Sequence, residues 1–333
     1  MLVNLINQSR ALAQVKLLAQ TDLNNMDAAI KDRLLARTKL IQDVTYHIIN
    51  SGGKRLRPTL LILVAKLFGY QGIRHINLAA SVEFIHTATL LHDDVVDHSD
   101  LRRGRPTANQ RWDNKSSILV GDFLFSQAFC LMSEDSDIQV LRILSKAASI
   151  IAEGEVKQLS SIANLELSID NYSQIIAAKT AELFAAACQV GAVIAVNDSA
   201  LQQAMYNFGL NLGMAFQIID DVLDYMASQA VMGKNIGDDF REAKVTLPII
   251  LAYQHSDQEE KNFWNRTIQH KNQHEQDFAQ ALTIFDKYNI IAKCLAIAEE
   301  FTAKAKQFID VAPDNKIKTA LIEILNYSIQ REG

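Results

Sequence analysis

Residues 84–107 read FIHTATLLHDDVVDHSDLRRGRPT and join an apolar segment to four aspartates and a basic cluster. The four aspartates fall within eight residues, and three arginines follow at once. The apolar part favours a helix over residues 77–98, which places the aspartates at its C-terminal end. A helix dipole collects partial negative charge at that end, so carboxylates there need a cation nearby.

Asp93 and Asp97 stand four residues apart, and a helix brings such positions onto one face with their Cβ atoms about 5–6 Å apart. Asp94 lies beside them. Mg²⁺ would relieve the repulsion, because it takes oxygen ligands from one or two carboxylates and shares the rest with water and phosphate. A single D-D-x-x-D motif is also typical of a solvated acidic helix end, so this motif alone leaves both interpretations open.

The same spacing occurs a second time, in FQIIDDVLDYM at residues 216–226. Asp220, Asp221 and Asp224 again close an apolar segment. Two identical constellations favour function over coincidence. Two facing acidic helices can hold several Mg²⁺ ions around one diphosphate, where the metals would neutralise a leaving group.

Composition predicts an all-α protein. Of 333 residues only 13 are glycine and 4 proline, so helix breakers are scarce. Long helical patterns cover residues 116–132, 138–163, 171–196 and 199–226, whereas the polar stretch 255–277 suggests solvated surface. No alternating strand pattern and no Ser/Gly-rich linker is found, which indicates one domain over residues 1–333.

Charge and cysteine content exclude several classes of protein. A net charge of −5 and a pI near 5.9 argue against nucleic acid as the main partner. The three cysteines are widely spaced, which fits a reducing compartment rather than disulfides or a zinc site. The apolar runs look too short for a transmembrane segment, and no signal peptide is evident, so a cytoplasmic protein is expected.

Several polar side chains outside the acidic motifs are candidates for binding. Lys54, Arg55 and Arg57 lie in GGKRLRP, which lacks the glycine and hydroxyl residue of a Walker A loop. Arginine suits phosphate oxygens, but ordinary surface charge is an equal alternative for this segment. Lys179 and Thr180 lie within a long helical pattern, where a lysine is more often solvated.

Four further residues keep two interpretations each. Lys234 and Lys244 flank an acidic loop and fit either phosphate binding or a merely charged loop. His86 is more often a hydrogen-bonded rim residue than a ligand. Gln217 precedes the second acidic motif within an apolar run, where its amide could touch a substrate or satisfy a buried neighbour.

Together, GGKRLRP, LLHDDVVD, LRRGRPT, the Lys179–Thr180 pair, FQIIDDVLD, GKNIGDD and KVTLP make the chain resemble the trans-isoprenyl diphosphate synthases. The resemblance spans residues 45–255 in unbroken order and is greatest to bacterial octaprenyl members, which supply the ubiquinone side chain. It implies a single-domain helical bundle around a deep central cavity, the isoprenoid synthase fold. It also implies a homodimer that condenses an allylic diphosphate, such as farnesyl diphosphate, with successive isopentenyl diphosphates.

The resemblance further assigns roles to residues. Three aspartates are expected to ligate Mg²⁺, with three ions present when diphosphate is bound: Asp93, Asp97 and Asp220. Three aspartates are expected to support them: Asp94, Asp221 and Asp224. Four basic residues are expected to bind the allylic diphosphate: Arg102, Lys179, Lys234 and Lys244. Four residues are expected to bind isopentenyl diphosphate: Lys54, Arg57, His86 and Arg103. Thr180 and Gln217 are expected to line the reacting carbons.

Product length can be argued sterically. Positions five and four before Asp93 lie a turn deeper along the helix, and they hold the small residues Ala88 and Thr89. In short-chain members a large aromatic residue stands there, so small residues indicate a long product. A floor is expected on the helix 116–132, which offers Phe125, Phe129 and Met132. Phe129 is favoured, although all three could be plain core.

Two residues depart from the family pattern. Arg105 and Ala243 stand where the family more often has lysine and glycine. Both changes are mild, because position 105 keeps its charge and alanine tolerates a helix at 243.

Several alternative functions are possible. A shorter-chain synthase differs in product size only. A class I terpene cyclase would normally carry an N-S-E type second motif. A phosphohydrolase using His92 and Asp93 would not need the second motif, and a non-catalytic subunit tends to lose acidic motifs.

Overall fold

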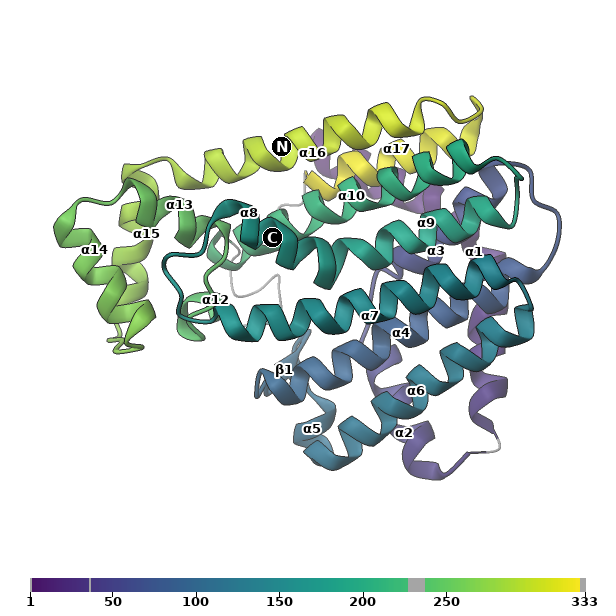
Figure 1. The fold of residues 1–333 in the computed structure, drawn as a ribbon, viewed down its shortest axis with the longest axis horizontal. Coiled ribbons are helices and arrows are strands. Elements are labelled where there is room, and N and C mark those ends of the chain that lie inside the picture. The colour runs from purple at the N-terminus through teal and green to yellow at the C-terminus, as the bar shows by residue number, and fades with distance from the viewer. Residues whose placement is uncertain (1, 36, 227–236, 330–333) are drawn as a thin grey trace.

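The computed structural model describes residues 2–35, 37–226 and 237–329. Helices dominate this part of the chain, as Figure 1 shows, and confirm the all-α fold. The first half contains α1 (Leu2–Leu35), α2 (Lys39–Asn50), α3 (Leu56–Leu67), α4 (Arg74–Val96), β1 (Leu101–Arg102), β2 (Arg105–Pro106), α5 (Ala108–Arg111), α6 (Asn114–Asp135) and α7 (Ile138–Ser161). The second half contains α8 (Ile169–Ile176), η1 (Ala177–Ala181), α9 (Glu182–Val193), α10 (Ser199–Met226), α12 (Asp238–Arg241), α13 (Leu247–His255), α14 (Gln258–Trp264), η2 (Asn265–Gln269), α15 (Asp277–Lys287), α16 (Ile290–Ile309) and α17 (Lys316–Ile329).

The long helices match the periodicity of the sequence closely. Residues 199–226 form α10 as expected, and the expected helices at 77–98, 116–132 and 138–163 appear as α4, α6 and α7 with ends shifted by one to three residues. The expected helix over 171–196 instead has three parts, because a turn of π-helix, η1, interrupts it. A π-helical turn inside an α-helix is frequent at functional sites.

One segment was wrongly expected to be solvated surface. Residues 255–277 include α14 and η2, and the indole of Trp264 is completely buried there. The ring packs against Phe240, Phe263 and Phe285. Polar residues dominate the stretch, but they occupy the outer face of a short amphipathic helix. The average polarity of the segment therefore did not reveal the apolar face of this helix.

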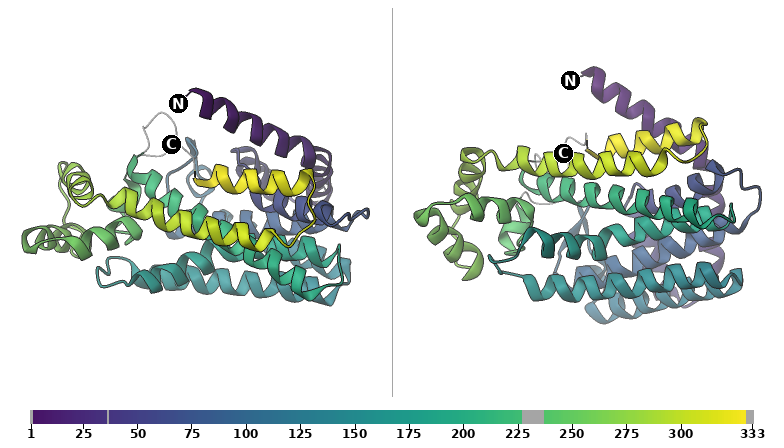
Figure 2. Two further views of the ribbon diagram at one scale, coloured as in Figure 1. Left: turned by 90° about the horizontal axis from the view of Figure 1, so that it is seen from above. Right: turned by 45° about the horizontal axis from the view of Figure 1, so that its top comes forward.

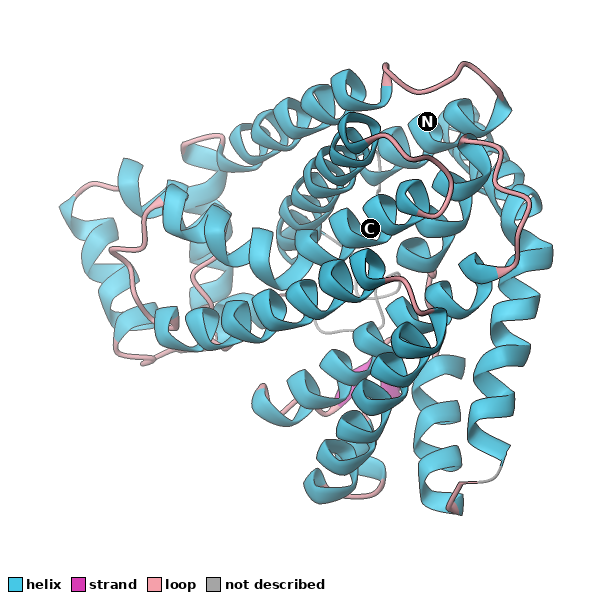
Figure 3. Ribbon diagram, turned by 45° about the vertical axis from the view of Figure 1, so that its right-hand side comes forward, coloured by secondary structure: helices cyan, strands magenta, loops and turns pink. Residues whose placement is uncertain are grey.

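The core consists of two apolar clusters that share α10. One cluster joins α3, α4, α6, α7 and α9 with the first half of α10, and the other joins the second half of α10 with α8 and α12–α16. Figure 2 shows the N-terminal end of α1 projecting from the bundle. In Figure 3 the β1–β2 hairpin is the only strand structure of the described chain. Helix α10 therefore ties the two clusters together and carries one acidic motif between them.

Three glycines allow helix backbones to approach α9 and η1 closely. A Cβ atom at Gly209 would lie 2.5 Å from the carbonyl oxygen of Phe184, and one at Gly213 would lie 2.5 Å from the Cα of Ala181. A Cβ atom at Gly191 would lie 2.5 Å from the carbonyl oxygen of Leu61. These contacts are with backbone, which cannot rotate away, so the spacing of the helices depends on these glycines.

Two helices of the described chain are long and apolar enough, by length and composition only, to cross a membrane. They are Asn114–Asp135 and the continuous helical stretch Ile169–Val193. The expectation that every apolar run is too short was therefore too strict. Most of Ile169–Val193 is buried in the bundle, and core helices pass the same test, so the finding is weak evidence for a membrane span.

We expect Gly213→Ala to lower the free energy of unfolding by about 1–3 kcal/mol, because the added methyl group meets the backbone of Ala181. Gly121→Ala is the matched control. It gains the same helix propensity, but its methyl group meets only the ring of His92, a side chain that can move. Urea unfolding of both variants checks this. Equal stability of the two variants would contradict the packing argument.

Candidate active site

The first acidic motif divides its carboxylates between two tasks. Asp94 is 1% exposed, and its Oδ1 accepts hydrogen bonds from Nε and an Nη of Arg102 at 2.9 and 2.8 Å. Asp93 and Asp97 are half-buried instead. Burial and the nearby charge of Asp97 raise the pKa of Asp93, although Lys179 opposes the rise. Asp93 and Asp97 therefore carry the concentrated negative charge, while Asp94 holds Arg102.

The second acidic motif divides in the same way. Asp224 is buried, and its Oδ2 accepts the backbone N–H of Asp239 at 3.0 Å, which fixes the start of α12. Asp221 is also buried and accepts hydrogen bonds from Tyr172 and Gln217. Asp220 is half-buried and lines a cavity. This placement supports Asp93, Asp97 and Asp220 as the metal-facing residues and the other three aspartates as their supports.

Lys179 and Thr180 connect the two acidic helices. Lys179 Nζ lies 2.7 Å from Glu155 Oε2 and 3.7 Å from Asp93 Oδ2, whereas Thr180 Oγ1 donates to Gln217 Oε1 at 2.7 Å. The two residues are neighbours on η1, so one π-helical turn contacts both α4 and α10. Gly154 permits this, because a Cβ atom there would lie 2.8 Å from the Lys179 backbone nitrogen.

Lys244 provides the second cation at the acidic end of α4. Its Nζ lies 2.8 Å from Asp97 Oδ2 and 2.6 Å from Glu242 Oε2, and these charges raise the pKa of Lys244 despite burial. The preceding residue, Ala243, was expected to tolerate a helix, but it lies beyond the end of α12. It has φ 55°, in the left-handed region where glycine is favoured, and its carbonyl accepts the N–H of Ala163, which also has positive φ.

The donor set fits a divalent cation that arrives with a phosphate group. The ends of α4 and α10 supply carboxylate oxygens, the kind of ligand that Mg²⁺ prefers, and Mg²⁺ characteristically takes few protein ligands. Within the described residues no three His, Cys, Asp or Glu side chains already converge as a metal cluster. The lysines at Asp93 and Asp97 act as counter-ions in that arrangement.

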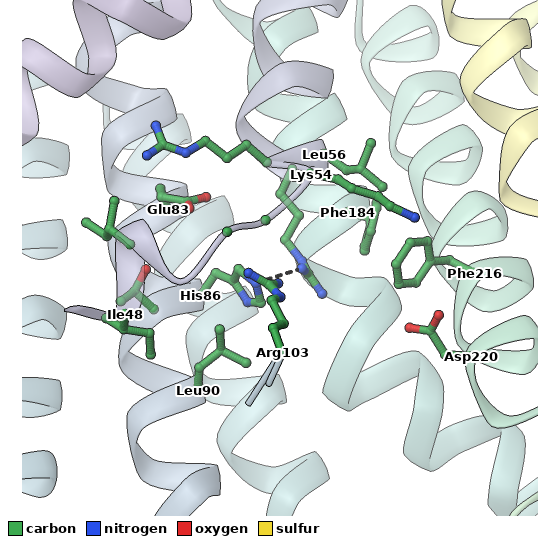
Figure 4. Close-up of a pocket in the computed structure, with 16 residues that line it drawn as sticks. Ile48, Lys54, Leu56, Glu83, His86, Leu90, Arg103, Phe184, Phe216 and Asp220 are labelled. Atoms are coloured by element: carbon green, nitrogen blue, oxygen red, sulfur yellow. Dashed lines mark hydrogen bonds between the residues drawn. The ribbon is translucent and has the colours of Figure 1, made fainter. Parts of the chain in front are cut away.

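A second binding region lies beside the acidic one. It is a cavity of about 500 Å³, shown in Figure 4, with Arg103 and His86 in its middle and Asp220 on the far side from Glu83. Its basic side chains come from the segment before α3, from the start of α3 and from the hairpin after α4. The sequence-predicted residues that line it are Lys54, Arg57, His86 and Arg103.

Local backbone geometry creates the space for these cations. Gly52 has φ 87°, which turns the chain before α3. A Cβ atom at Gly53 would lie 2.8 Å from an Nη of Arg103, so the absent side chain leaves room for that guanidinium. Lys54 Nζ lies over the ring of Tyr327 at 4.9 Å, which brings α17 to the edge of the cavity.

Burial and mutual repulsion tune the pKa values of these groups. Arg57 lies over the Phe184 ring at 4.4 Å, and burial lowers the pKa of its guanidinium to about 10, so it stays charged near neutrality. Burial and three nearby arginines hold the pKa of His86 well below its usual value. The neutral ring can accept the hydrogen bond from Arg57 Nη1, whose distance to His86 Nε2 is 3.2 Å. The cavity thus presents positive charge and a fixed imidazole to an anion.

Sequence reasoning missed three side chains of this region. Glu83 is buried among arginines, and desolvation raises its pKa. The burial of Glu155 and the charge of Asp93 raise the Glu155 pKa to about 7, against the effect of Lys179. Tyr172 bonds Asp221. Glu83 lies three residues before His86, and that helical spacing is a signal that could have revealed it.

The residues expected to set product length differ in their burial. Ala88 is fully buried, and Thr89 is half-buried with its hydroxyl on the carbonyl of His86. Phe129 is 42% exposed on the outer face of α6, so the expectation that it forms the floor of an interior tunnel is wrong. Met132, on the same helix, is completely buried. Phe125 is half-buried and stacks on His92.

Lys234 was expected to bind diphosphate and lies outside the described residues. Every other predicted site residue has a place in the structure. The acidic and π-helical residues gather at one site, and the basic residues of the α3 segment gather beside it.

Comparisons with known proteins agree with this geometry. A model of the polyprenyl synthetase family matches residues 38–285. The octaprenyl diphosphate synthase of Escherichia coli (strain K12) is 39% identical over 321 residues, which cover 96% of this chain and 99% of that enzyme.

Solved structures show the same relationship. A decaprenyl diphosphate synthase from Rhodobacter capsulatus is similar with a TM-score of 0.92 and 44% identity, covering 96% of this chain and 100% of that one. A polyprenyl synthase from Caulobacter crescentus CB15, complexed with calcium and isoprenyl diphosphate, is similar with a TM-score of 0.93 and 44% identity, covering 97% of this chain and 98% of that one. The chain belongs to the polyprenyl synthetase family and is a prenyltransferase.

Proposed function

We propose that this prenyltransferase is an Mg²⁺-dependent octaprenyl diphosphate synthase that extends farnesyl diphosphate with successive isopentenyl diphosphates. The observation that carries the proposal is the position of η1. Its Lys179 and Thr180 reach both acidic helices, and the basic cavity containing Arg57 and Arg103 lies beside Asp220. This arrangement would place one diphosphate in the basic cavity and the other, with its metal ions, at the acidic helix ends.

Different side chains have different roles in the proposed reaction. Asp93, Asp97 and Asp220 would hold Mg²⁺, which would neutralise the charge of the allylic diphosphate as it leaves. Lys179 and Lys244 bind the oxygens of that diphosphate. The allylic C–O bond breaks, a new C–C bond forms to isopentenyl diphosphate, and the departing diphosphate takes the proton that is released.

The second substrate is held by fixed donors. Lys54, Arg57 and Arg103 offer charged N–H groups, and such groups bind phosphate oxygens strongly. The aromatic rings of Phe184 and Phe216 line the same cavity. These rings exclude water from the allylic cation, which water would otherwise capture.

Product size, pathway and assembly are the finer parts of the proposal. Similarity to octaprenyl and decaprenyl diphosphate synthases supports a long product, for which we propose the eight isoprene units of the octaprenyl relative, and such a product would serve as a quinone side chain. Exposed apolar residues on α6 and α7 support a homodimer through these helices: Ile118, Leu119, Phe129, Ile138, Val156 and Leu159. We place this single-domain enzyme in the cytoplasm, where both substrates are water-soluble.

We expect the protein, given Mg²⁺, farnesyl diphosphate and labelled isopentenyl diphosphate, to form one main polyprenyl diphosphate near eight units. Sizing the dephosphorylated product by chromatography checks this. Asp93→Asn should lower incorporation by about 100-fold, because it removes a metal-facing carboxylate. Removal of Mg²⁺ by a chelator should abolish incorporation. Absence of label in the polyprenol fraction of the wild type would overturn the proposal.

We expect Gly53→Ala to raise the KM for isopentenyl diphosphate by about 10-fold, as expected for loss of one charge-assisted hydrogen bond from Arg103. The added methyl group meets the flexible end of Arg103, so the urea midpoint should stay near that of the wild type. Steady-state kinetics with each substrate varied in turn measures the effect. The KM for farnesyl diphosphate serves as internal control, and a parallel rise in both would argue against separate sites.

Product length should respond to Thr89 and not to Phe129. Thr89→Phe places a ring one turn before Asp93 at a half-buried position, and it should shorten the main product. Phe129→Ala changes a side chain on the outer face of α6, directed away from the interior of its own protomer, and should leave the length unchanged. Chromatography of the polyprenols decides both. A longer product from Phe129→Ala would restore Phe129 as the floor.

A further inference from the structure

Four buried or half-buried side chains form a continuous series of hydrogen bonds behind the acidic site. The hydroxyl of Tyr172 donates to Asp221 Oδ2 at 2.6 Å, and Gln217 Nε2 donates to Asp221 Oδ1 at 2.7 Å. The hydroxyl of Thr180 donates to Gln217 Oε1 at 2.7 Å. The series starts on α8, crosses to α10 and returns to η1, so it connects three segments around the site.

The donors and acceptors of the series alternate in one direction. Both oxygens of Asp221 accept, one from the Tyr172 hydroxyl and the other from the NH₂ group of Gln217. The carbonyl oxygen of Gln217 then points to Thr180 and accepts its hydroxyl hydrogen. Since that hydrogen is engaged, the lone pairs of the Thr180 oxygen are left for another partner. Without Asp221 the amide could flip, and Thr180 could reverse its role.

The same side chains line a small cavity with the two site lysines. This cavity has a volume of about 60 Å³, and Tyr172, Thr180, Gln217 and Asp221 line it together with Lys179 and Lys244. Tyr172 is 3% exposed and Asp221 is 5% exposed, so bulk water does not satisfy either group. Buried polar groups of this kind hold one arrangement strongly, because breaking it leaves an unpaired group.

We propose that Tyr172 is a positioning residue, which fixes Asp221 and thereby orients the Gln217 amide and the Thr180 oxygen toward the reacting carbons. Asp221 then serves alignment rather than metal binding. This inference rests on the proposed function, because the lone pairs of Thr180 would stabilise the allylic cation. The expected signature is a loss in the chemical step without a loss in substrate or metal binding.

The test compares Tyr172→Phe with Tyr206→Phe. Tyr206 is a matched control, since its hydroxyl donates to the buried carboxylate of Glu182 at 2.7 Å, a bond between α10 and α9 that includes none of the site aspartates. We expect Tyr172→Phe to lower kcat by about 10–100-fold, as for residues that orient a site. The KM of both substrates and the half-saturating Mg²⁺ concentration should stay within about twofold of the wild type, a shift too small to represent a lost ligand. Tyr206→Phe should keep the wild-type kcat.

A second pair of variants separates alignment from metal binding. Asp220→Asn should raise the half-saturating Mg²⁺ concentration, whereas Asp221→Asn should lower kcat and leave the Mg²⁺ dependence unchanged. An equal shift of the Mg²⁺ dependence in both would make Asp221 a metal ligand and overturn the inference. So would a Tyr172→Phe enzyme with wild-type kcat, or a Tyr206→Phe enzyme with the same loss. An inactive wild type would instead overturn the proposed function itself.

Discussion

The repulsion among carboxylates at the ends of α4 and α10 is the constraint on which the site depends. Two carboxylates one helical turn apart repel by about 3 kcal/mol at an effective dielectric constant of 20. The described chain offsets this with cations from distant segments, such as Lys244 on Asp97 and Arg102 on Asp94. Because these cations come from loops and from η1, the charges of the site also determine where those segments lie.

The helices can meet this constraint because their backbones approach one another closely. Gly154 and Gly213 lie on either side of η1, and each faces backbone or Cβ atoms of that turn. A side chain at either position would push η1 away from α7 or α10. Lys179 and Thr180, consecutive on this turn, then reach α4 and α10 respectively. The two glycines thus determine how closely η1 packs against α7 and α10.

The periodicity of apolar residues was enough to predict the helices, and the repeated D-D-x-x-D spacing was enough to predict the acidic site. It was not enough to show which aspartate of each motif faces the site. That choice depends on partners far away in the chain, since Tyr172 is 49 residues from Asp221. The exposure of Phe129 and the left-handed conformation of Ala243 depend on packing and on loop geometry, which local sequence does not determine.

Carboxylates beside the cations of the proposed site would favour highly charged ligands. Glu83 lies among Arg55, Arg57 and Arg103, and Glu155 binds Lys179. These carboxylates hold the cations in place before a substrate arrives, which reduces the reorganisation needed on binding. An incoming anion must then compete with a carboxylate already present. A diphosphate carries more charge and more acceptor oxygens than a carboxylate does, so it can displace the internal partner, whereas a weaker anion gains little from doing so.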